Sequence, residues 1–162
     1  MRWVRLDGLH LTLRFLGPTP DERIEAARVA VQAAGTTMGP FDVEIGGAGT
    51  FPPRGRPRAL WLGVRAGVEA LAGLAAEVDR ALVGAGWPPE TRPFRAHLTL
   101  ARADGVAAGS RIGDRLVETA AELRIGARVD KICLFESLTG GGPARYEPLE
   151  LVELGVGPIT GR

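Results

Sequence analysis

The chain has 162 residues, a formal net charge of +1, 45% hydrophobic residues and 24% charged residues. This composition fits one packed domain over residues 1–162 and excludes a disordered polyelectrolyte. No apolar run approaches the roughly 18 residues of a membrane-spanning helix, and no basic segment followed by an apolar one opens the chain. We therefore expect a cytoplasmic protein.

The first half of the sequence predicts two strands, a helix and two further strands. A short strand at 3–5 precedes residues 9–16, whose alternation of polar and apolar side chains predicts a half-buried strand. Thr19, Pro20 and Glu22 predict a capped helix start, and the helix ends at Gly35. Strands follow at 41–45 and 58–64. A glycine-rich connection at 46–49 and an arginine-rich turn at 54–58 separate them.

The second half repeats this pattern loosely. It predicts helices at 68–85 and 110–121, strands at 94–102, 129–138 and 146–154, a turn at 140–143 and a frayed tail at 155–162. The similar order of elements in the two halves indicates a weak duplication of an α+β unit. The chemistry of such a molecule is expected between two sheets.

The only two histidines open the same tetrapeptide, His10-Leu11-Thr12-Leu13 and His97-Leu98-Thr99-Leu100. In a strand, residues two apart face the same way, so each histidine lies beside a threonine while the leucines anchor the strand. Histidine is the usual acid–base catalyst near neutral pH. Two such pairs suit in-line displacement at phosphorus: one histidine takes a proton from water, the other protonates the leaving oxygen, and the hydroxyls bind the non-bridging oxygens.

Other candidate sites are weaker. Cys133, the sole cysteine, lies in an apolar run and is expected to be a small buried hydrophobe, so no internal disulfide forms. The spacing of cysteine and histidine does not predict a zinc site. The glycine-rich run at 46–49 lacks the lysine and helix start of a phosphate loop. The arginine run at 54–58 is either a solvated turn or a phosphate contact.

The paired motifs and their flanks resemble the two-histidine (2H) phosphoesterase superfamily, and most closely the RNA 2′,3′-cyclic phosphodiesterases, also called 2′-5′ RNA ligases. The resemblance covers almost the whole chain and rests on Trp3-Val4 and on residues 9–17, 49–52, 61–64, 94–102 and 134–137 followed by Tyr146. It implies an α+β fold of two pseudo-symmetric lobes, each of mainly antiparallel sheet with outer helices, around a central cleft.

The resemblance also implies which reaction is catalysed and what role each site residue plays in it. Such enzymes hydrolyse an RNA 2′,3′-cyclic phosphate end to a 2′-phosphate without a metal or other cofactor. His10 is then the general acid that expels the 3′ oxygen, and His97 is the general base on water. Thr12 and Thr99 hold the phosphate. Arg102 matches a phosphate-contacting arginine, although a solvated strand end is an equal reading.

Phe15 matches a position at which an aromatic ring packs near a nucleobase, whereas its periodicity places it on the leucine face of the strand, in the core. The chain departs from many relatives at Ala96, where they carry proline. Relatives also have a strand and a helix before the Trp3 segment. Either the natural start lies upstream of Met1 or the chain lacks this unit, and we expect the second. That absence would remove a strand from one sheet and expose an apolar edge.

Several alternatives share these residues. Reversible 2′-5′ RNA ligation uses the same histidines in the opposite direction, and another cyclic nucleotide, or ADP-ribose 1″,2″-cyclic phosphate, needs the same site. A non-catalytic RNA-binding module is a different class, which the intact histidines and threonines disfavour. We expect RNA ends or cyclic nucleotides as the substrate, and no metal, membrane or obligate protein partner.

Overall fold

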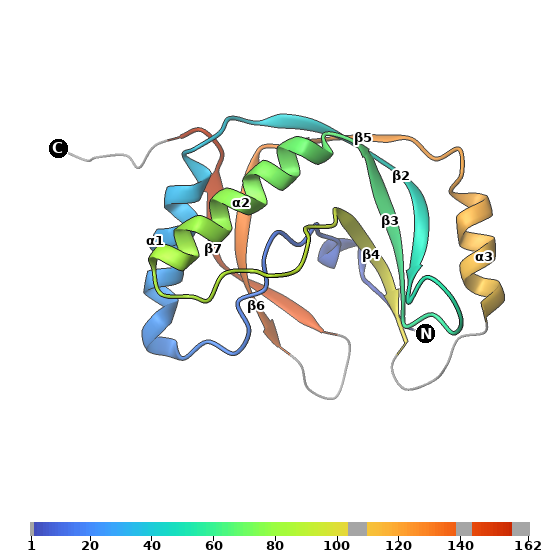
Figure 1. Ribbon diagram of the computed structural model, residues 1–162, viewed down its shortest axis with the longest axis horizontal. Helices are drawn as coiled ribbons and strands as arrows, with labels where there is room; N and C mark the ends of the chain where they lie inside the picture. The colour runs from blue at the N-terminus through green and yellow to red at the C-terminus, as the bar shows by residue number, and fades with distance from the viewer. Residues whose placement is uncertain (1, 104–109, 139–143, 157–162) are drawn as a thin grey trace.

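A computed structural model of the chain describes residues 2–103, 110–138 and 144–156 and shows an α+β fold (Figure 1). The predicted turn at 140–143 and the residues from 157 onward lie outside this part of the chain. The helices and strands are β1 (Arg2–Trp3), α1 (Ile24–Gly35), β2 (Phe41–Phe51), β3 (Ala59–Ala66), α2 (Val68–Gly84), β4 (His97–Arg102), α3 (Ser110–Thr119), β5 (Ile125–Val129), β6 (Lys131–Leu138) and β7 (Arg145–Glu153). Two short 3₁₀ turns, Leu6–Gly8 and Asp21–Arg23, lie before α1.

Two antiparallel sheets build the molecule. Five strands form one sheet in the order β1-β4-β3-β2-β5, and β6 pairs with β7 in the other. Figure 1 shows α1, α2, β6 and β7 gathered on one side and β3, β4 and α3 on the other, with β2 and β5 running between them. The predicted α+β class and two-sheet arrangement are confirmed. Each lobe, however, draws elements from both halves of the sequence.

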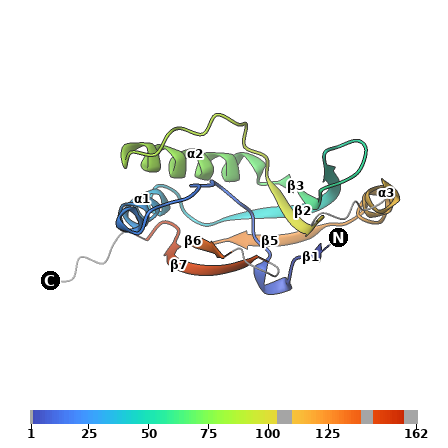
Figure 2. The ribbon, with the colours of Figure 1, turned by 90° about the horizontal axis from the view of Figure 1, so that it is seen from below.

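The main core lies where α1 and α2 pack over β6 and β7. Figure 2, seen from below, shows the two helices on one side of these strands. The apolar stripe of α2 that the 3.6-residue period predicts is buried here, with Leu74 and Leu82 fully enclosed. Burying a leucine completely contributes about 2 kcal/mol. Leu13 and Leu16 pack against this core, which therefore supports the segment that carries the first motif.

The start of α1 differs from the prediction. The α-helix begins at Ile24, after a 3₁₀ turn at Asp21–Arg23, and the cap position of that turn is Pro20. Thr19 does not cap the helix, because its hydroxyl donates to the carbonyl of Gly17 at 3.0 Å. A short hydroxyl side chain can bond to a nearby carbonyl in place of a helix N–H, and that competing bond is the one formed here.

The glycine-rich run is part of a strand. β2 continues through residues 46–49 and spans Phe41–Phe51, so the predicted connection is wrong. A side chain at Gly49 would place its Cβ 2.2 Å from Cζ2 of Trp61, and one at Gly46 would lie 2.3 Å from the carbonyl oxygen of Leu123. Gly49 and Gly46 are therefore explained by close packing against β3 and the chain before β5, and Gly47 by its positive φ of 71°.

The predicted strand at 129–138 is two strands. β5 (Ile125–Val129) pairs with β2, and β6 (Lys131–Leu138) pairs with β7, so the chain changes sheets at Asp130. The mostly exposed residues of β5 gave no apolar pattern by which to predict it. A strand that is held mainly by its backbone pairing leaves little periodic signal in the sequence.

The predicted strand at 9–16 is also wrong. These residues, termed the first-motif segment, form only one isolated β-bridge, between Leu11 and Leu98. β1 occupies the same edge of β4 further along, where the backbone N–H of Val4 also donates to the carbonyl of Leu100 at 2.8 Å. Alternating side chains predict a strand, but a strand forms only where a partner is present along its length, and here the partner is present only at Leu11.

Candidate active site

The single bridge sets the register between the two motifs. Because Leu11 pairs antiparallel with Leu98, one step in either direction brings His10 across from Thr99 and Thr12 across from His97. Neighbours of a bridged pair point to the face opposite that pair, so the four polar side chains share one face. The two motifs that the sequence predicted to meet are thus brought together.

The side chain of His10 is held by a backbone carbonyl two residues earlier and by aromatic rings of the smaller sheet. Its Nδ1 lies 2.8 Å from the carbonyl oxygen of Gly8. Its ring contacts Tyr146 edge-on at 4.6 Å between centroids and lies 6.0 Å from the ring of Phe135. In the sequence, Tyr146 and Phe135 are indicated only by the family resemblance, which includes residues 134–137 and Tyr146.

His97 has the matching environment in the larger sheet. Its Nδ1 lies 2.7 Å from the carbonyl oxygen of Arg95. The rings of Phe51 and Trp61 lie 5.2 Å and 6.2 Å from the imidazole, both at steep interplanar angles. Each histidine is therefore bonded to the carbonyl two residues before it and packed against two aromatic rings.

This shared geometry determines the tautomer. A carbonyl oxygen can only accept, so Nδ1 must carry the proton in both rings, and Nε2 is left as the reactive nitrogen. A neutral ring then accepts a proton at Nε2, and a charged ring donates one from it. Neither Thr12 nor Thr99 has a hydroxyl partner in the described residues, so both hydroxyls are available to a ligand.

Arg102 reaches the same face through an irregularity in β4. Strict alternation would place Arg102 opposite His97 and Thr99. However, Trp61 pairs with Thr99 while Leu60 pairs with Ala101, so β4 has one extra residue at this point. Ala59 then pairs with Arg102. Because Ala59 and Trp61 share a face of β3, the bulge turns Arg102 to the histidine face, as bulges next to active sites do.

A cavity of about 510 Å³ adjoins the motifs. It is lined by Thr12, His97 and the aromatic rings of Phe15, Phe51 and Phe94, with small residues of α2 on one wall. Phe15 is 59% exposed, so the core position indicated by its periodicity is wrong. The alternation does not reach Phe15 because the first-motif segment is paired only at Leu11.

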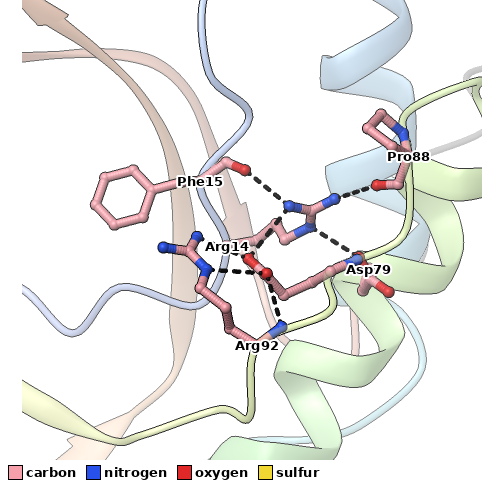
Figure 3. A network of polar contacts seen from close by, with 6 residues as sticks. Arg14, Phe15, Asp79, Pro88 and Arg92 are labelled. Carbon is pink, nitrogen blue, oxygen red and sulfur yellow. Dashed lines mark hydrogen bonds and ion pairs between the residues drawn. The ribbon is translucent and has the colours of Figure 1, made fainter.

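Sequence reasoning missed a polar network beside this cavity (Figure 3). Arg14, one of the polar residues of the alternating segment 9–16, has a side chain only 9% exposed. Its Nε donates to Asp79 Oδ1 at 2.7 Å, and its Nη1 donates to the carbonyl of Phe15 at 2.9 Å. It also bonds to the carbonyl of Pro88. The network joins the first-motif segment to α2 and to the loop before β4.

The carboxylate of Glu90 extends this network toward the second motif. It accepts from Arg92 through the backbone N–H at 3.0 Å and through the guanidinium at 3.0 and 3.1 Å. These bonds, chiefly the side-chain ones, lower the pKa of Glu90 to about 2. Arg92 lies in the loop that leads to His97, so the network connects both motifs.

The described residues include no group of three or more histidine, cysteine, aspartate and glutamate side chains placed to hold a metal ion. Cys133 is half-buried, and burial, together with the charge of Glu150, raises the pKa of its thiol. That agrees with a packing role for this cysteine, since an inert thiol is the protonated one. No helix within the described ranges is long and apolar enough to span a membrane.

Comparison with known proteins agrees with this geometry. Residues 2–141 match the family model of the 2′-5′ RNA ligase superfamily. A protein of Methanothermobacter thermautotrophicus named RNA 2′,3′-cyclic phosphodiesterase is 33% identical over 159 residues, which cover 95% of this chain and 83% of that protein. One of the same name from Aeropyrum pernix is 37% identical over 105 residues, or 65% of this chain and 58% of the relative. The chain thus spans little more than half of some curated relatives.

Solved structures give the same result. TT0787 of Thermus thermophilus superposes with a TM-score of 0.76 at 25% identity, covering 97% of this chain and 83% of that one. Escherichia coli LigT complexed with 3′-AMP superposes with a TM-score of 0.69 at 28% identity, covering 94% and 80%. With two sheets meeting at paired His-x-Thr-x motifs, the chain belongs to the 2′-5′ RNA ligase superfamily. The predicted resemblance is confirmed.

Proposed function

We propose that the protein hydrolyses RNA 2′,3′-cyclic phosphate ends to 2′-phosphates without a metal ion. The observation that carries this proposal is the matched pair of histidines. In each, Nδ1 is fixed by the carbonyl two residues earlier, and Nε2 has no partner among the described residues and lies across from the other motif's threonine. The relatives named RNA 2′,3′-cyclic phosphodiesterase support the choice of reaction.

The reaction needs one base, one acid and donors to the phosphate. Nε2 of His97 takes a proton from water, and the water oxygen bonds to phosphorus. The bond from phosphorus to the 3′ oxygen breaks, and Nε2–H of His10 protonates that oxygen. Thr12, Thr99 and Arg102 bind the non-bridging oxygens, where negative charge grows. Exchange of protons with solvent restores both histidines.

The test is turnover of 2′,3′-cyclic nucleotides with and without a chelator, with identification of the phosphate isomer. The expected product is the 2′-phosphate, formed equally in both conditions, with a bell-shaped dependence of rate on pH. His10→Ala and His97→Ala should each lower kcat at least about 100-fold. A 3′-phosphate product, dependence on a metal, or full activity of either variant would contradict the proposal.

Binding separates this function from a non-catalytic RNA-binding module. Under the proposal, His97→Ala still binds the cyclic nucleotide while it no longer turns it over. The matched control is Arg128→Gln, because Arg128 is an exposed residue of the far edge strand that pairs with Asp42. If the wild type binds the cyclic nucleotide but releases no product, the module is the correct assignment.

A further inference from the structure

Arg54, Arg56 and Arg58, termed the arginine turn, connect β2 to β3 and are all exposed. The turn is nevertheless firmly anchored. Pro57, between the last two arginines, is buried, and the backbone N–H of Arg58 donates to the carbonyl of Phe51 at 2.6 Å. The N–H of Ala103, just after β4, donates to the carbonyl of Arg58 at 2.8 Å. The turn therefore presents its guanidinium groups from a loop whose end, at Pro57 and Arg58, is anchored.

The arginine turn continues the row of polar residues along β4. His97, Thr99 and Arg102 share one face of that strand, and Arg102 is the cross-strand partner of Ala59, the residue that follows the turn. On the other side, the arginine turn follows β2, whose last residue, Phe51, has a ring that contacts His97. A chain of phosphates that leaves the motifs past Arg102 thus meets the arginine turn next.

Charge is segregated around this row. The sequence has no aspartate or glutamate in residues 45–68 or 91–103, although the whole chain has a net charge of only +1. Outside these two ranges many arginines pair with carboxylates, among them Arg5, Arg14, Arg80, Arg124 and Arg128. Within the described residues, no side-chain partner is found for Arg54, Arg56, Arg58 or Arg102. Among the described residues, therefore, no carboxylate pairs with the arginines of this row, and unpaired positive charge favours a polyanion.

We propose that the arginine turn binds phosphates of the RNA strand that leads to the cyclic end, which makes an oligonucleotide the preferred substrate of the proposed function. Guanidinium groups bind phosphate with two parallel hydrogen bonds, and an anchored turn loses little conformational entropy when it does so. These contacts read the backbone and carry no base sequence. They act on substrate binding and lie apart from the histidine chemistry.

The test compares two substrates and two double variants. Turnover of a 2′,3′-cyclic mononucleotide and of an oligoribonucleotide with the same cyclic end is measured for the wild type and for Arg54→Gln/Arg56→Gln. The control is Arg124→Gln/Arg128→Gln, which removes the same charge from β5 and the residue before it, at the far edge of the sheet. The turn variant should lose roughly tenfold more kcat/KM on the oligonucleotide than on the mononucleotide, mainly through KM.

Salt dependence gives a readout that a merely structural effect would not reproduce. Each lost phosphate contact on a single strand lowers the slope of log affinity against log salt by about 0.7, so the turn variant should lose about 1.4. Equal losses on both substrates, or an equal loss in the control, would overturn the inference. If the wild type turns over neither substrate, the proposed function fails. In that case, fluorescence anisotropy with the same oligonucleotide still tests the arginine turn. If the slope of log affinity against log salt is the same in the turn variant and the wild type, phosphate binding by the arginine turn is excluded.

Discussion

The guanidinium of Arg14 donates its Nε–H to Oδ1 of Asp79 over 2.7 Å, and this contact fastens the first-motif segment to α2. The same carboxylate oxygen accepts the backbone N–H of Glu90 at 3.1 Å. The segment has only one β-bridge to the second motif. Arg14 is therefore a second attachment that holds His10 and Thr12 at their distance from His97.

Replacing Arg14 should lower both stability and turnover. Arg14→Gln leaves the carboxylate of Asp79 without its charged partner in a half-buried site, which costs about 3 kcal/mol of unfolding free energy. Because the first-motif segment is then held less firmly, we expect kcat to fall more than KM rises. Urea unfolding and steady-state kinetics measure the two effects.

The matched control is Arg80→Gln on the exposed side of α2, where Arg80 pairs with Glu77. It should change neither quantity noticeably. A variant at Arg14 that unfolds like the wild type would show that the network does not hold the segment.

The carboxylate of Glu90 makes stability depend on acid pH. Its pKa in the folded protein is about 2, below its ordinary value of 4.5. Its contribution to stability is therefore complete above about pH 4.5 and is lost as the pH falls towards 2. Unfolding free energies should decline over this window in the wild type and less steeply in Glu90→Gln. Identical slopes for the two proteins would refute the assignment.

Gly49 keeps Trp61 in place beside His97. In Gly49→Ala the added Cβ would lie 2.2 Å from Cζ2 of Trp61, so the indole must move. We expect a loss of about 2 kcal/mol in stability and reduced turnover, because Trp61 packs near His97. Gly73→Ala on α2 is the control, since its Cβ meets nothing within 4 Å. That change should stabilise the helix by about 0.5 to 1 kcal/mol. Thermal unfolding of both variants checks the contrast.

Arg102 should matter for phosphate binding. Losing a charge-assisted hydrogen bond costs about 1.5 to 3 kcal/mol, so Arg102→Gln should lower kcat/KM by about 10- to 100-fold. Product inhibition by the 2′-phosphate should weaken in parallel. The comparison is with Arg128→Gln, which is remote from the site. Unchanged inhibition in Arg102→Gln would show that the side chain does not contact phosphate.

Much of the fold could be predicted from local patterns. The period of α2 and the repeated His-x-Thr-x tetrapeptides are properties of neighbouring residues, and both helix and motif partnership were predicted correctly. The α+β class followed from the order of elements. These features depend on periods of two and 3.6 residues, which are visible in any short window.

What failed depended on partners distant in the sequence. The burial of Arg14 requires Asp79 and Pro88, and no window around residue 14 contains them. The bulge in β4 that turns Arg102 depends on its register with β3. Gly49 of β2 is explained by the ring of Trp61 on another strand, and Gly46 by the carbonyl of Leu123. Tertiary pairing decided each of these positions over local propensity.

The bridge between Leu11 and Leu98 also has a consequence for folding kinetics. It joins residues from opposite halves of the chain, so closing it requires a large loss of chain entropy. The helices and the β6–β7 hairpin form through contacts closer in sequence. In refolding from urea, the circular dichroism signal of secondary structure should therefore recover before activity does, because the two motifs are joined last.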